Sequence, residues 1–140
     1  MNDKIDHMIA RFMNNNDFYG GATEEDIRNA ENVLGFEFPS EYREYLKRYG
    51  SGGICGVDLQ GIEGSLGASV VTATERYRKL GIDKNIVVIW DLGDFVSCMN
   101  TTNDDPSVYS WYRSYPELVK RYDSFYDFLA DVFQEAIDNY

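Results

Sequence analysis

The stretch from Phe36 to Gly53 constrains the fold most, because it specifies a helix with a defined start, buried face and end. Pro39 cannot lie inside a helix, so Ser40 is the predicted N-cap. Gly50 supplies the backbone freedom that commonly ends a helix. An aromatic face recurs at helical spacing through Tyr42, Tyr45, Leu46 and Tyr49. We therefore assign a structural role, in packing and turning the chain, to Phe38, Pro39, Tyr42, Leu46, Tyr49, Gly50, Gly52 and Gly53.

Helical patterns also occupy both ends of the chain. One helix is expected from about Asp3 to Met13, and a second begins after the N-cap Thr23 and ends at Gly35. The predicted buried face of the second helix is Ile27, Ala30, Val33 and Leu34. The last helix is expected from about Ser124 to Asn139, with apolar residues at helical spacing over four turns.

The middle of the chain has mainly β patterns. A strand-like pattern covers Ile54–Ile62, and a helix capped by Ser69 or Thr72 should end at Leu80–Gly81. Ile86–Trp90 is a continuous apolar run typical of a central strand. Further strands, joined by short turns, are predicted at Phe95–Asn100 and Val108–Tyr112. This order predicts an α+β single domain over residues 1–140, with N-terminal helices and a C-terminal helix packed on a central antiparallel sheet of about four to six strands.

The chain is strongly acidic. It has 24 aspartates and glutamates against 13 lysines and arginines, a formal net charge of −11. Phosphates repel such a surface, which argues against nucleic acid and anionic membranes as direct ligands and permits a basic protein partner. The N-terminal region does not resemble a signal peptide, and no apolar run is long enough to span a membrane. With no disulfide framework, we expect a cytoplasmic protein.

The sequence does not predict a catalytic, metal or cofactor site. His7 is the only histidine, and Cys55 and Cys98 lack the spacing of metal ligands. The glycines at 50–56 follow a helix and precede a strand-like pattern, the reverse of a phosphate-binding loop. Asp91 and Asp94 flank a predicted turn, where aspartates commonly occur without catalytic work. We therefore expect a protein that is not an enzyme and has no cofactor.

Two surface features suggest partner binding. Carboxylates at spacings of four, four and three form a stripe on the last helix: Asp127, Asp131, Glu135 and Asp138. An aromatic cluster, Tyr109, Trp111, Tyr112 and Tyr115, follows two more aspartates. A solvated helix face and ordinary core packing are the alternatives for these two features. The predicted partner-binding residues are Asp91, Asp94, Asp104, Asp105, Tyr109, Trp111, Asp127, Asp131 and Glu135.

The same helix-and-glycine stretch carries a family resemblance. The segment ENVLGFEFPSEYREYLKRYGSGGICGV resembles the opening of the SUKH superfamily, which groups yeast cell-wall-synthesis regulators with many bacterial immunity proteins. GASVVTATERYRKLG and NIVVIWDLGDFVSCMNT are similar, in the same order, to YobK-type bacterial antitoxins. The resemblance runs roughly from Thr23 to Tyr140, mostly through residues that define the fold.

The resemblance implies an immunity protein that binds and neutralises a cognate toxin domain in the cytoplasm. Nuclease toxins tend to be basic, which agrees with the acidic composition. The alternative is a cytosolic regulatory scaffold that binds endogenous proteins, as the yeast members do. Exposed aromatic residues allow a monomer or a weak homodimer.

Overall fold

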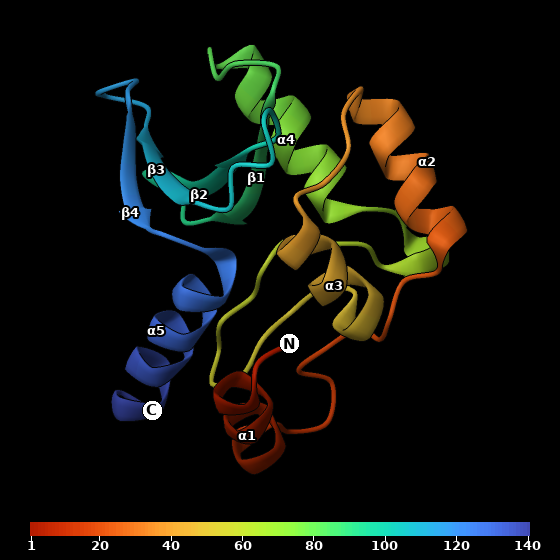
Figure 1. The fold of residues 1–140 in the computed structure, drawn as a ribbon, viewed down its shortest axis with the longest axis vertical. Coiled ribbons are helices and arrows are strands. Elements are labelled where there is room, and N and C mark those ends of the chain that lie inside the picture. Colours follow the sequence, from red (N-terminus) through yellow and green to blue (C-terminus); the bar gives the residue numbers. More distant parts are fainter.

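The computed structural model describes residues 1–140 as one α+β unit. Three helices come first: α1 (Asp3–Phe12), α2 (Glu24–Leu34) and α3 (Ser40–Tyr49). A 3₁₀ turn at Gly64–Leu66 precedes α4 (Ser69–Lys79). The strands β1 (Ile86–Asp91), β2 (Phe95–Asn100), β3 (Val108–Tyr112) and β4 (Leu118–Tyr122) then lead to α5 (Phe125–Asp138) (Figure 1). The α+β class, the antiparallel sheet and its flanking helices are confirmed.

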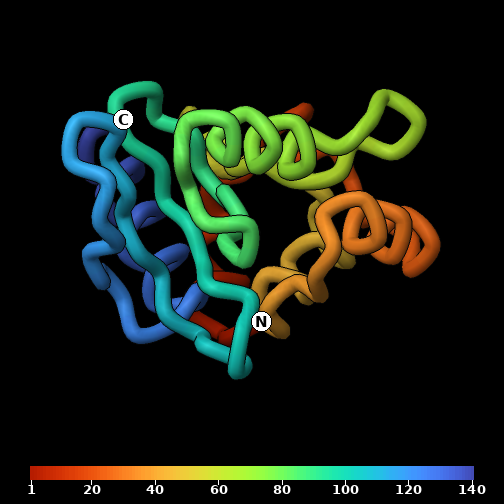
Figure 2. The backbone as a smooth tube through the Cα atoms, turned by 90° about the horizontal axis from the view of Figure 1, so that it is seen from above, coloured from red at the N-terminus to blue at the C-terminus, as the bar shows by residue number.

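The sheet is an antiparallel meander in the order β1-β2-β3-β4, sandwiched between helices. α4 packs against one face, where Tyr77 and Trp111 meet edge to face. α5 lies on the opposite side (Figure 2). It shares the larger core with α1, α2 and α3, and the first and last helices pack on each other. Side chains alternate between the two faces along β2 and β3. On β2, Val96 and Cys98 point to α4, and Ser97 points away from it.

α3 is the hub of the larger core. Tyr42, Tyr45 and Leu46 are fully buried, and the two tyrosine rings each meet Phe125 of α5 edge to face. Their hydroxyls donate to backbone carbonyls of the following segment: Tyr42 to Gln60 at 2.7 Å and Tyr45 to Gly52 at 2.8 Å. This helix face thus lies in the core, with Tyr49 half-buried at its end.

The segment predicted as a strand at 54–62 is not one. It is an irregular strap, residues 50–62, which makes only the isolated bridges Phe18–Gly52 and Gly52–Leu59. Close backbone packing explains the irregular path. A Cβ on Gly61 would collide with the carbonyl oxygen of Gly50, and one on Gly52 with that of Asp17. The glycines let the strap pass beside other backbone without a regular ladder.

Other expectations need correction at single residues. Ser40 does not cap α3, because the helix begins with Ser40 itself and the N-cap is Pro39. Ser69 does not cap α4 either; its hydroxyl accepts from the Gly61 N–H of the strap and donates to the Glu63 carboxylate that follows it. Val33 is 61% exposed. Glu31 is buried in its place, beside Ala30 and Leu34, and its carboxylate accepts from the backbone N–H of Phe38 at 2.7 Å.

The sheet also differs from expectation at its two edges. The apolar run of β1 predicted a central position, yet β1 is an edge strand. Its outer side is covered by α4 and the strap: the Thr74 hydroxyl accepts from Val88, and the Gln60 backbone N–H donates to the Ile89 carbonyl. The other edge, β4, was not predicted at all. Its residues are largely exposed, so its sequence has no apolar alternation.

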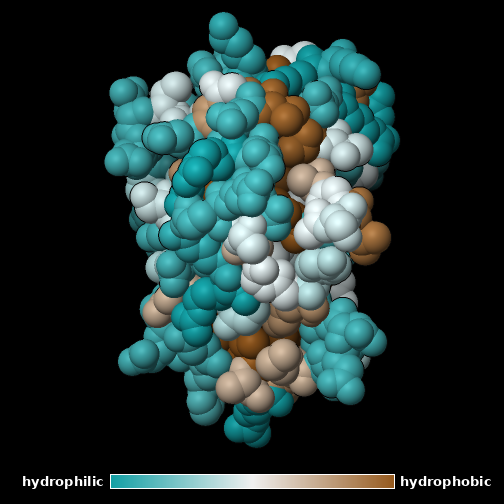
Figure 3. All heavy atoms as spheres, turned by 90° about the vertical axis from the view of Figure 1, so that its right-hand side faces the viewer, coloured by the Kyte–Doolittle hydropathy of each residue, from teal (hydrophilic) through white to brown (hydrophobic).

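The surface agrees with the acidic, polar composition. The side of the molecule that carries α2 is mostly hydrophilic, with smaller groups of apolar atoms (Figure 3). None of the helices is long and apolar enough to cross a membrane.

Candidate functional site

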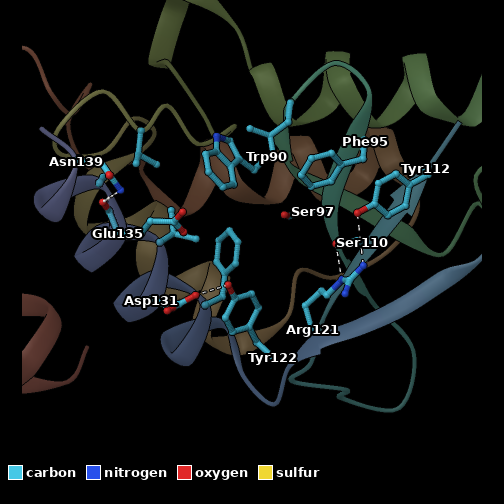
Figure 4. Close-up of a pocket in the computed structure, with 15 residues that line it drawn as sticks. Trp90, Phe95, Ser97, Ser110, Tyr112, Arg121, Tyr122, Asp131, Glu135 and Asn139 are labelled. Carbon is cyan, nitrogen blue, oxygen red and sulfur yellow. Dashed lines mark hydrogen bonds between the residues drawn. The ribbon is translucent and has the colours of Figure 1, made fainter.

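A groove of about 660 Å³ lies between α5 and the part of the sheet that α5 leaves open. We call it the α5–sheet groove. Its residues come from the strap, the β1–β2 hairpin, β3, β4 and α5, and Figure 4 shows the labelled side chains around one hollow. The 15 residues that line the groove are Val57, Trp90, Leu92, Phe95, Ser97, Ser110, Tyr112, Arg121, Tyr122, Phe128, Asp131, Val132, Glu135, Ala136 and Asn139.

The sheet half of the groove combines aromatic rings with small polar groups. Phe95 and Tyr112 stack with ring centroids 5.1 Å apart. Ser110 is buried, and its hydroxyl accepts from Nε of Arg121 at 3.3 Å. Ser97 is also buried, and its hydroxyl makes no hydrogen bond within the protein. Small side chains on two neighbouring strands thus leave the floor hollow where larger residues would fill it.

The helix half of the groove has an apolar base and an acidic rim. Trp90 meets Phe128 edge to face at 6.0 Å, beside Val132 and Ala136. Asp131 and Glu135 stand above this base, one helical turn apart, and both are exposed. The two carboxylates of the acidic rim therefore have an apolar surface on one side and solvent on the other.

Tyr122 joins the two halves. Its hydroxyl donates to Oδ2 of Asp131 at 2.6 Å, and its ring meets Phe128 edge to face. Burial of the phenol, followed by this hydrogen bond, raises the pKa of Tyr122 to about 12. The phenol therefore stays a neutral donor at physiological pH and holds the middle of α5 against β4.

The charged groups of the groove lack ionic partners within the protein. None of the chain's salt bridges includes Asp131, Glu135 or Arg121. The guanidinium of Arg121 makes only two long contacts, to Ser110 and to the Tyr112 hydroxyl at 3.5 Å. The groove thus offers unpaired carboxylates on the helix side and an unpaired cation on the sheet side (Figure 4).

Of the predicted partner-binding residues, Asp131 and Glu135 line the groove. Asp127 is exposed on the same helix but does not line it. Asp91 lies at the end of β1, where its carboxylate accepts from the Tyr77 hydroxyl at 2.7 Å and from the Gly93 backbone. Its contacts thus tie the hairpin to α4 and brace the turn, whereas Asp94 is exposed.

The predicted aromatic and aspartate cluster is divided by the fold. Trp111 is 3% exposed and packs under α4, while Tyr109 is half-buried on the same face. The Tyr109 hydroxyl donates to Asp105 at 2.6 Å. Burial opposes ionisation of Asp105, but the hydrogen bonds from Tyr109 and Ser107 outweigh it and lower its pKa. Asp104 is exposed in the adjoining turn. These residues lie outside the groove, and Tyr112 is the member of the cluster that enters it.

Sequence reasoning missed several residues of the groove. Trp90 was assigned to a buried strand, and Arg121 and Tyr122 lie on the unpredicted β4. Strand alternation puts Ser110 and Tyr112 on one face of β3, opposite Tyr109 and Trp111. A search for small polar residues at facing positions of predicted strands would have found Ser97 and Ser110, which pair directly across β2 and β3.

The groove does not hold the residues of a metal centre. No group of three or more His, Cys, Asp and Glu side chains in the chain converges as metal ligands would. The one histidine, His7, is exposed on α1. The chemistry that the groove offers is non-covalent recognition by rings, carboxylates, hydroxyls and one guanidinium.

Comparison with known families agrees with this architecture. A family model described as SUKH_5, SMI1-KNR4 cell-wall, matches residues 1–134. The match includes α1, which the resemblance seen from Thr23 onward leaves out, and it ends within α5. Because the match covers nearly the whole chain, the chain belongs to the SMI1-KNR4 family of the SUKH superfamily.

Proposed function

We propose that this chain is a non-enzymatic immunity protein that binds a toxin domain and neutralises it in the cytoplasm. The SUKH family includes immunity proteins, so membership supports this class of function. The observation that carries the proposal for this chain is the α5–sheet groove, where exposed carboxylates border an aromatic base. Aromatic residues beside polar rims are the usual composition of protein-binding hot spots.

The charge of the chain supports a basic toxin domain as the partner. A protein of net charge −11 attracts a basic domain over several ångströms and speeds their encounter. Nuclease toxins bind phosphates and are commonly basic on their active surface. An acidic inhibitor can occupy that surface and exclude the nucleic acid. The resemblance to YobK-type antitoxins is consistent with a basic toxin domain as the partner. A YobK-type role for this chain remains a prediction.

Growth rescue tests the proposal. A candidate toxin domain taken from a neighbouring gene is expressed from an inducible promoter, with and without the intact chain. We expect growth arrest without the chain and normal growth with it. A destabilised variant that does not accumulate as folded protein serves as the negative control. Arrest that persists with folded, abundant chain would refute the immunity function and favour the scaffold alternative.

A further inference from the structure

We propose that the α5–sheet groove binds one surface loop of the toxin domain, in which an apolar side chain lies between a lysine or arginine and an acidic group. The basic residue meets α5 and the acidic group meets β4. This inference rests on the proposed function and specifies its interface. It is carried by the apolar base and the opposite, unpaired charges on the two sides of the groove.

The size and the base of the groove suit a short loop. A hollow of about 660 Å³ lies within the range that holds a drug-sized ligand, which corresponds to a few side chains. Trp90, Phe128 and Val132 form its apolar base, and Phe128 and Val132 are also part of the main core. This base is therefore rigid before binding, which lowers the entropy cost of docking an apolar side chain there.

The helix side of the groove selects a cation. Oδ2 of Asp131 receives the Tyr122 hydroxyl, and the structure gives no protein donor to Oδ1 or to the Glu135 carboxylate. Two like charges at this helical spacing repel each other. A lysine or arginine between them removes this repulsion and gains charge-assisted hydrogen bonds. The same carboxylates repel the phosphates of a nucleic acid, so the groove favours a protein loop.

The sheet side of the groove selects an acceptor. The Arg121 guanidinium has five donors, and its two protein contacts, at 3.3 and 3.5 Å, are long. It has no carboxylate partner within the chain, and the free hydroxyl of Ser97 lies on the same half of the groove. A carboxylate or backbone carbonyl of the loop can use these donors. Opposite charges on the two sides thus fix the direction in which the loop lies.

Charge-reversal pairs on α5 test the inference. The groove pair is Asp131→Lys with Glu135→Lys, and the control pair is Asp127→Lys with Asp138→Lys, which changes the net charge equally on the same helix outside the groove. Arg121→Glu tests the sheet side. The probe is a purified candidate toxin domain taken from a neighbouring gene, carrying an inactivating active-site substitution. Association and dissociation rates are measured at low salt, and thermal melting confirms that each variant is folded.

Steric variants test occupancy of the groove independently of charge. Ala136→Trp fills the hollow, and Gln134→Trp adds the same side chain on an exposed face of α5 outside it. The chain's two tryptophans, Trp90 and Trp111, lie on opposite faces of the sheet. In a Trp111→Phe background, the fluorescence of Trp90 therefore reports directly on the groove when the toxin domain is added.

The expected result is that the groove pair slows association about tenfold or more and Arg121→Glu speeds dissociation about tenfold or more, whereas the control pair changes association less than about threefold. Ala136→Trp should weaken affinity at least about tenfold, and Gln134→Trp should bind like the wild type. Equal effects of the two charge pairs, or wild-type binding by Ala136→Trp, would overturn the groove assignment while leaving the immunity function intact. Failure of the wild-type chain to bind the toxin domain would overturn the proposed function and, with it, this inference.

Discussion

Replacing Tyr42 by phenylalanine measures how strongly α3 holds the strap. The substitution keeps the fully buried ring and its edge-to-face contacts with Phe38 and Phe125. It removes only the hydroxyl, which donates to the Gln60 carbonyl at 2.7 Å. That carbonyl accepts no other hydrogen bond within the protein. The perturbation is therefore one lost donor and one acceptor left without its protein partner.

The magnitude follows from these contacts. Leaving a buried acceptor unsatisfied costs about 1–3 kcal/mol, and we expect about 2 kcal/mol for Tyr42→Phe. With an unfolding entropy of about 2.1 cal/mol/K per residue, the 140-residue chain should lose about 7 °C in Tm. Tyr45→Phe should cost about half as much, because its acceptor, the Gly52 carbonyl, keeps a second bond from the Leu59 N–H.

Chemical denaturation and thermal melting of the two variants and of Tyr49→Phe provide the assay. Tyr49 lies on the same helix, and its hydroxyl makes no hydrogen bond within the protein, so its loss should cost less than about 0.5 kcal/mol. The reasoning is refuted if Tyr42→Phe is as stable as Tyr49→Phe, because the strap would then be held by packing alone.

Three further predictions concern other parts of the fold. Gly61→Ala should destabilise the protein by about 3 kcal/mol or more, because the new Cβ would collide with the Gly50 carbonyl. Glu31→Ala should cost about 2 kcal/mol in denaturant unfolding, since it orphans the Phe38 backbone N–H. Stability should be retained below about pH 10 and fall as pH rises through about 12, because an unfolded tyrosine ionises at about 10 and folded Tyr122 at about 12. Unfolding free energies measured along this pH range check the last prediction.

Each of these predictions has a control within the chain. Gly56→Ala meets no neighbouring atom and should cost only the strain of its positive φ, about 1 kcal/mol. Glu25→Ala lies on the exposed face of α2 and should change stability by less than about 0.5 kcal/mol. Tyr122→Phe should lessen the alkaline loss of stability. An unchanged pH profile in that variant would contradict the role given to its phenol.

Much of the fold was readable from local patterns. Every main helix was predicted within a few residues, because apolar spacing and turn residues agree there, as at Thr23 and Gly35. Non-local contacts account for the failures. The strap is held by tyrosine hydroxyls and backbone packing from elsewhere, and the coverage of β1 comes from Thr74 and Gln60. A pattern within one segment does not contain such partners.

The candidate site was less readable than the fold. The acidic stripe on α5 was visible, and two of its members, Asp131 and Glu135, line the groove. The hollow itself depends on which strand face α5 leaves open and on the unpredicted β4. Trp111 and Asp91 have side chains typical of a binding site, but both make internal contacts. Trp111 is buried under α4, and Asp91 accepts a hydrogen bond from the Tyr77 hydroxyl. Composition alone could not distinguish those from groove residues.

Hydrogen exchange of the chain, with and without the purified toxin domain, tests the central claim most directly. The account predicts slower exchange in the second half of α5 and in the β1–β2 hairpin, the segments that line the groove, with α2 unchanged. Protection confined to α2 and the 3₁₀ turn at Gly64–Leu66, with α5 exchanging as in the free chain, would contradict it.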